Sequence, residues 1–90
     1  MTNEIPNIVR SSRIFTKVEM HHIDLWFSYD TLVAFLHDHP NEGVALVVMQ
    51  NQWGSTTGRH INMIDGGTAE ARARRVGRAE FVKRLEALKL

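Results

Sequence analysis

The chain has 90 residues, 43% of them hydrophobic, and a formal net charge of +1 at pH 7. This length predicts one small domain with a modest core. The chain contains no cysteine, which excludes a disulfide framework, a thiolate zinc site and a cysteine nucleophile. The first residues lack an apolar core of signal-peptide length, and no stretch reaches the roughly 18 apolar residues of a membrane span. We therefore expect a soluble, cytoplasmic protein.

Charge is distributed unevenly along the chain. Residues 19–65 include six acidic residues and one basic residue, Arg59. Residues 72–90 include seven basic residues and two acidic ones. This asymmetry favours an anionic partner for one face, or self-association of opposite faces.

The first half of the chain is typical of β-structure. Apolar and polar residues alternate in "RIFTKVEM" and "HIDLWFSY", as they do in half-buried strands. "TLVAFLHDH" is a short run after a turn-like "SYD", which favours a strand over a helix. "VALVVMQNQW" is almost continuously apolar and predicts a central strand that is buried on both faces. The predicted strands are therefore residues 13–20, 22–29, 31–39 and 44–53.

The stretch "NQWGSTTGRHIN", Asn51–Asn62, predicts a hairpin. In this interpretation "GSTTG" is the turn, and "RHINMI" is a strand that places His60 and Asn62 on one face. Gly66 and Gly67 would close the hairpin because glycine adopts positive φ at little cost.

The C-terminal segment differs in kind. Phe81, Leu85 and Leu88 follow the i, i+4, i+7 spacing of an amphipathic helix, whereas residues 72–75 fit a strand, a helical turn or a loop. The sequence thus predicts an α+β fold, with a mainly antiparallel sheet of four or five strands and one C-terminal helix packed on it. We expect residues 1–12 to form a loose lead-in and residues 13–90 a single domain.

Three stretches together resemble a family of small uncharacterised proteins from bacteria and their phages, a domain of unknown function. They are "FSYDTLVAF", "NQWGSTTGRHINMIDGG" and "RVGRAEFVKRL", and the similarity spans residues 23–85. In that group a Ser-Tyr-x-Thr strand precedes a tryptophan, a Thr-Thr-Gly-basic-His-x-Asn hairpin and a closing helix. This chain departs from the pattern at Leu32, where a proline is expected, which puts the local turn in doubt. The resemblance implies no activity, but it implies a phage or prophage setting inside a bacterium.

The Trp53–Asn62 hairpin is the candidate ligand site. Hydroxyl side chains, a planar guanidinium and an indole are the groups that hold an anion or a nucleotide, and glycine allows the backbone to approach a ligand closely. The alternative is a hairpin in which these residues serve only the turn and the core. The candidate ligand-binding residues are Trp53, Ser55, Thr56, Thr57, Gly58, Arg59, His60 and Asn62.

Metal binding and covalent catalysis have weaker support. His37 and His39 are two residues apart and could point to one side of a strand, but no metal-ligand spacing such as H-E-x-x-H is present. No G-x-S-x-G elbow accompanies the serines. The sequence therefore predicts no metal, no cofactor and no catalytic residue, although His60, with Asp65 nearby, could serve as a general base.

A basic patch precedes and enters the C-terminal helix, and it could meet phosphates or simply keep a helix face solvated. Its residues are Arg72, Arg74, Arg75 and Arg78.

Three functional hypotheses follow. The first, which we favour, is a phage-type accessory binding protein rather than an enzyme, whose hairpin holds a nucleotide, nucleic acid or an acidic surface of a host protein. The second is a small hydrolase of a phosphorylated or nucleotide substrate that uses His60, with or without a metal. The third is an assembly module without a ligand. An exposed edge strand at residues 13–20 also predicts a homo-oligomer, most simply a dimer.

Overall fold

The computed structural model describes residues 7–12, 14–39 and 43–88. Its internal contacts divide the chain into two compact units, Met1–Leu46 and Val47–Leu90. The fold is α+β, as the sequence predicts. None of the helices in the described residues is long and apolar enough to cross a membrane.

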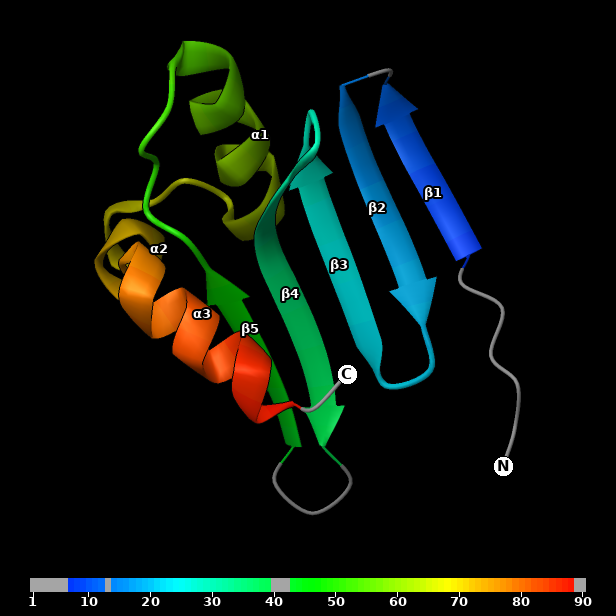
Figure 1. The fold of residues 1–90 in the computed structure, drawn as a ribbon. Coiled ribbons are helices and arrows are strands. Elements are labelled where there is room, and N and C mark those ends of the chain that lie inside the picture. The colour runs from blue at the N-terminus through cyan, green and yellow to red at the C-terminus, as the bar shows by residue number, and fades with distance from the viewer. Residues whose placement is uncertain (1–6, 13, 40–42, 89–90) are drawn as a thin grey trace. The chain divides into compact units, whose positions relative to one another are not determined.

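The strands of the sheet follow one another in chain order, β1-β2-β3-β4-β5 (Figure 1). The first unit contains β1 to β4 and residues 43–46 of β5. β1 to β4 are paired antiparallel. Two-residue connections join β2 to β3 and β3 to β4, and His22 and Tyr29 in these connections adopt φ of 68° and 55°. The strands are β1 (Asn7–Ser12), β2 (Phe15–Met20), β3 (Ile23–Ser28), β4 (Thr31–His39) and β5 (Gly43–Val48).

The alternating pattern accounts for β2 and β3, and the short run after "SYD" accounts for β4; all three predicted strands are confirmed. Phe15 and Ile23 are buried on β2 and β3. On β4 three consecutive residues, 33–35, are buried, which simple alternation does not allow. The alternation is also interrupted within this run: Trp26 pairs with Ala34 but Phe27 pairs with Leu32, so β4 has one extra residue, a β-bulge.

Two predictions about the strands need correction. Residues 7–12, expected in a loose lead-in, form β1, so β2 is not an edge strand but lies between β1 and β3; residues 1–6 lie outside the described residues. The predicted central strand at 44–53 is β5, which ends at Val48 and is last in the sheet order. Gly43–Leu46 are exposed and only Val47 and Val48 are buried, because an apolar run does not itself show how many faces are covered.

The second unit contains the helices α1 (Ser55–Asp65), α2 (Ala69–Arg74) and α3 (Arg78–Ala87). Ile61 of α1 and Phe81 of α3 are buried in it. Val76, between α2 and α3, forms a parallel bridge with Met49. Val76 donates its N–H to the carbonyl of Val48 at 2.9 Å and accepts from the N–H of Gln50 at 2.8 Å. These bonds fix the α2–α3 connection to the chain that leaves β5.

The prediction of a C-terminal helix is confirmed by α3; residues 89–90, which follow Leu88, lie outside the described residues. The undecided segment around Arg72 is α2, whose N-cap Thr68 accepts the N–H of Ala71 at 3.1 Å.

The predicted hairpin over Trp53–Asn62 is wrong, because Ser55–Asp65 forms the helix α1 (Figure 1). The buried residues Thr57, His60 and Ile61 have the i, i+3, i+4 spacing of one helix face. Gly66 ends the helix in the left-handed conformation at φ 89°, and its N–H bonds to the carbonyl of Asn62 at 2.7 Å. The positive φ expected at Gly66 and Gly67 is present, but it serves the end of a helix rather than a hairpin.

Candidate functional site

The N-terminal turn of α1, Gly54–Arg59, contains most of the predicted ligand residues, and Asn51 organises the chain that leads into it. The Asn51 side chain accepts the N–H of Trp53 at 3.0 Å and donates to the carbonyl of Gly54 at 3.3 Å. Such a local side-chain bond replaces a backbone turn. It holds Trp53 directly before the helix, with 39% of the residue exposed.

Gly58 has a packing role rather than the ligand-approach role that the sequence suggested. A Cβ at this position would lie 2.9 Å from Nδ2 of Asn51, so a larger residue would displace that amide from its position against the helix. Gly54, the N-cap, has open space around it. Of the two glycines, therefore, Gly54 is the one whose backbone another molecule can approach.

One side of the N-terminal turn is accessible. Ser55 and Arg59 are exposed and Thr56 is half-buried. The Arg59 guanidinium donates to Oγ1 of Thr56 at 3.5 Å, which places the positive charge beside the hydroxyl. Residues three and four apart on a helix are neighbours, so these three side chains share one surface.

The other side of the turn faces inward. Thr57 and His60 are 6% and 7% exposed. Burial, and secondarily the neighbouring Arg59 charge, lowers the pKa of the His60 imidazole. Consecutive helical residues point about 100° apart, and Arg59 is exposed while His60 is buried, so these two side chains do not form a common outward surface.

Asn62 is half-buried and is bonded within the unit. Its Oδ1 accepts from the guanidinium of Arg75 at 2.9 Å. Arg75 also donates twice to the Asp65 carboxylate, both bonds being 2.8 Å long. The side chains of Arg75 and Asp65 are only 8% and 7% exposed, so this is a buried bidentate pair that ties the end of α1 to the end of α2.

This pair shifts the titration of both partners. The hydrogen bond from Arg75 is the largest influence that lowers the pKa of Asp65, and the N–H of Gly67, 3.0 Å from Oδ1, acts in the same direction. The carboxylate in turn raises the pKa of Arg75. The predicted basic patch thus loses Arg75 to an internal role, whereas Arg72, Arg74 and Arg78 are exposed.

The chemistry available at the N-terminal turn of α1 is anion binding. A helix leaves the N–H groups of its first turn without partners inside the helix, and its dipole places partial positive charge there. The cap is a glycine, and the first turn, "STTGR", contains no acidic residue. Arg59 adds a full positive charge beside this helix end.

Comparison with known proteins gives a family and no activity. The sequence profile of DUF8033, a family of unknown function, matches residues 2–83. The chain belongs to this family. Neither a curated protein nor a solved structure matches it. Membership in a family of unknown function is what the resemblance predicted, and the match includes the whole of β1 to α2.

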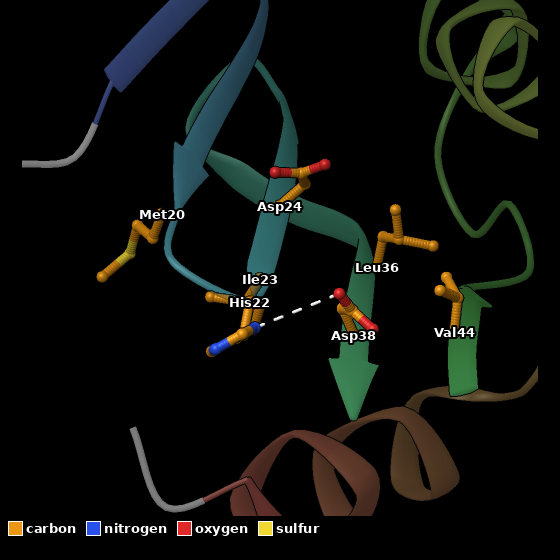
Figure 2. Close-up of a pocket in the computed structure, with 7 residues that line it drawn as sticks. All are labelled: Met20, His22, Ile23, Asp24, Leu36, Asp38 and Val44. Carbon is orange, nitrogen blue, oxygen red and sulfur yellow. Dashed lines mark ion pairs between the residues drawn. The ribbon is translucent and has the colours of Figure 1, made fainter. Parts of the chain in front are cut away.

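A second candidate site lies in the first unit of this DUF8033 protein and was not predicted. A pocket of about 270 Å³ opens beside the β2–β3 connection (Figure 2). The dashed line in Figure 2 joins Nδ1 of His22 to Oδ2 of Asp38, which are 4.0 Å apart. The pocket is lined by Met20, His22, Ile23, Asp24, Leu36, Asp38 and Val44.

Strand register explains why the sequence did not reveal this pocket. Asp24 on β3 pairs with Leu36 on β4, and Leu36 and Asp38 are two residues apart, so the three side chains project from one face. That pairing depends on the bulge in β4, which the sequence does not signal. In the described residues there is no group of three His, Cys, Asp or Glu side chains that could hold a metal; the side chain of His39 lies outside them.

Proposed function

We propose that this protein is a small binding protein that holds an anionic group at the N-terminal turn of α1. The observation that supports this most is the Arg59 guanidinium beside the Thr56 hydroxyl, on the accessible side of a glycine-capped helix end without acidic residues. Phosphate and carboxylate oxygens are the acceptors that such donors prefer.

The exposed Trp53 favours a nucleotide or a nucleic acid over an acidic protein surface as the source of that group. An indole stacks on any base, and Trp53 immediately precedes the turn, held by the Asn51 amide. In this proposal the phosphate meets the helix end and Arg59, while the base stacks on the indole.

The hydrolase alternative has less support. Its general base would be His60, but this imidazole is buried, and burial lowers its pKa. A general base must come within about 3 Å of the proton that it removes, and the accessible side of the turn presents Ser55, Thr56 and Arg59 instead.

A thermal-shift screen tests the proposal. A ligand that binds only the folded state raises the midpoint of unfolding by mass action. We expect a shift with nucleotides or short oligonucleotides, and little shift with an acidic peptide of equal charge. Arg59→Ala should weaken binding by about tenfold, since a hydrogen bond to a charged group is worth about 1.5–3 kcal/mol, and Trp53→Ala should weaken it as well.

Arg84→Ala is the matched control, because it removes the same charge from an exposed site in the same unit. Equal loss of the shift in Arg59→Ala and Arg84→Ala would mean that ligands respond to overall charge, and would refute a site at α1. A shift that the acidic peptide produces as strongly as the nucleotides would assign the site to a protein partner.

The wider setting is part of the same proposal. We place the protein in the cytoplasm of a bacterium, with a phage or prophage origin, on the resemblance of its motifs. We also propose a homo-oligomer, now through β1, because the sheet order leaves this strand at an edge and an edge strand offers unpaired backbone groups. Light scattering during size-exclusion chromatography tests this directly, since a monomer at all concentrations would contradict it.

A further inference from the structure

The pocket of the first unit combines an apolar floor with negative charge. Leu36 and Val44 provide apolar surface from neighbouring strands, and Met20 and Ile23 provide it near the β2–β3 connection (Figure 2). Asp24 and Asp38 place two carboxylates at the same opening. A pocket that is partly apolar, with a few convergent polar groups, is the usual form of a small-molecule site.

Both carboxylates can still accept strong donors. Oδ2 of Asp24 is 3.8 Å from the Lys17 ammonium, which lies closer to Glu19, at 3.2 Å. Oδ2 of Asp38 is 4.0 Å from Nδ1 of His22. These separations exceed the roughly 2.7–2.9 Å of a charge-assisted hydrogen bond. An incoming ammonium group could therefore make shorter contacts than either carboxylate has now.

We infer that this pocket is a binding site for an alkylammonium group, the chemistry shared by a small aliphatic amine and a lysine side chain. The ammonium would lie between Asp24 and Asp38, and the alkyl chain would cover Leu36 and Val44. The volume, about 270 Å³, is just below the range of about 300–1,000 Å³ of pockets for drug-sized ligands, which suits a short chain. This site is independent of the anion site proposed at α1.

Titration followed by NMR of the backbone amides tests the inference, with n-butylammonium as the probe and n-butanol as its uncharged counterpart. Because the probe is small, we expect affinity on the order of millimolar. The amides of residues 20–24, 36–38 and 44 should move with n-butylammonium and not with n-butanol. Equal movement with both probes, or movement spread over the whole chain, would overturn the inference.

Charge-removing variants distinguish binding in the pocket from nonspecific attraction to negative charge. Asp38→Asn and Asp24→Asn should each weaken n-butylammonium binding by about tenfold or more, since each removes a charged acceptor. Asp30→Asn is the control, because Asp30 is an exposed acid of the same unit and does not line the pocket. An equal loss in Asp30→Asn would show nonspecific attraction and refute the site.

Two further variants test the apolar floor of the pocket. Val44→Ala should weaken binding, whereas Leu46→Ala, on the same strand but not in the pocket lining, should not. Both side chains are exposed, 64% and 43%, so neither change should unfold the protein. Identical binding in Val44→Ala and the unaltered protein would exclude the proposed position of the alkyl chain.

A second titration identifies the source of the ammonium group. The tripeptide acetyl-Gly-Lys-Gly-amide presents a lysine side chain with its backbone, and n-butylammonium presents the free amine. Tighter binding of the tripeptide at the same amides would indicate a polypeptide partner, and tighter binding of the free amine would indicate a metabolite. Failure of both probes to move these amides would refute the site.

Discussion

Two arginine–carboxylate pairs of the second unit have nearly the same Nε–oxygen distance and very different surroundings. Arg75 contacts Asp65 at 2.8 Å with both side chains less than 10% exposed. Arg84 contacts Glu80 at 2.7 Å on α3, with exposures of 49% and 46%. Distance therefore does not distinguish them, but the loss of one partner leaves a buried charge in the first pair and a hydrated one in the second. The comparison shows which basic residues the fold needs and which remain available to a ligand.

The largest expected effect is at the buried pair. Arg75→Ala should lower the free energy of unfolding by about 3–5 kcal/mol, because it leaves the Asp65 carboxylate buried without its partner. Urea denaturation followed by circular dichroism measures this. A loss below about 1 kcal/mol would mean that water reaches the carboxylate and that the pair is not buried in solution.

Acidification should remove part of the free energy of unfolding that the Arg75–Asp65 pair contributes. The pKa of Asp65 is lowered in the folded state, so its contribution is present above the ordinary aspartate pKa of about 3.9 and is lost as the pH falls through the lower folded value. In Asp65→Asn this loss should disappear. The pKa of His60 is also lowered in the folded state. The unaltered protein and Asp65→Asn should therefore both lose the contribution of His60 to the free energy of unfolding as the pH falls below about 6.5. Urea midpoints from pH 8 to pH 2.5 resolve the two windows.

Substitution of the two glycines after α1 should lower the free energy of unfolding by less than the loss of Arg75 does. Gly67→Ala adds a Cβ within 2.9 Å of the Asn62 side chain, at a residue with φ 67°. Gly66→Ala meets the same left-handed penalty at φ 89° but open space. We expect a loss of about 1–2 kcal/mol for Gly66→Ala from backbone strain, and a greater loss for Gly67→Ala, because Asn62 would have to leave Arg75. Equal losses would contradict the role of Asn62.

The exposed pair should show the smallest effect. Arg84→Ala should leave the urea midpoint almost unchanged, because exposed i, i+4 pairs contribute little and are screened by salt. A loss comparable to that of Arg75→Ala would mean that exposure does not separate the two pairs.

Sequence patterns predicted the strands β2 to β4 and the helix α3 because each is a local periodicity that tertiary contacts left in place. They misplaced α1 because "RHINMI" alternates as a strand would, whereas Thr57, Ile61 and Ile64 also satisfy a helical spacing. The sequence "DGG" after this segment is a helix-stop signal that could have decided the matter.

The two candidate sites differ in how much of each could be predicted from the sequence. Trp53, Ser55, Thr56 and Arg59 could be proposed as ligand residues because their chemistry is visible in one short stretch, although their geometry is that of a helix end. The role of Arg75 could not be predicted, since Asp65 is ten residues away and meets it only after α1 and α2 have formed. The pocket beside His22 depends on the register across three strands, which a bulge shifts.

The most direct test of the anion site is an NMR titration with inorganic pyrophosphate, observing the backbone amides of Ser55 and Thr56 and the indole N–H of Trp53. We predict that these signals move together and saturably, that Arg59→Ala weakens the response by about tenfold, and that Arg84→Ala does not. Signals at Ser55 and Thr56 that stay fixed while amides near Arg72 and Arg78 move would place the anion on the basic patch and contradict the account.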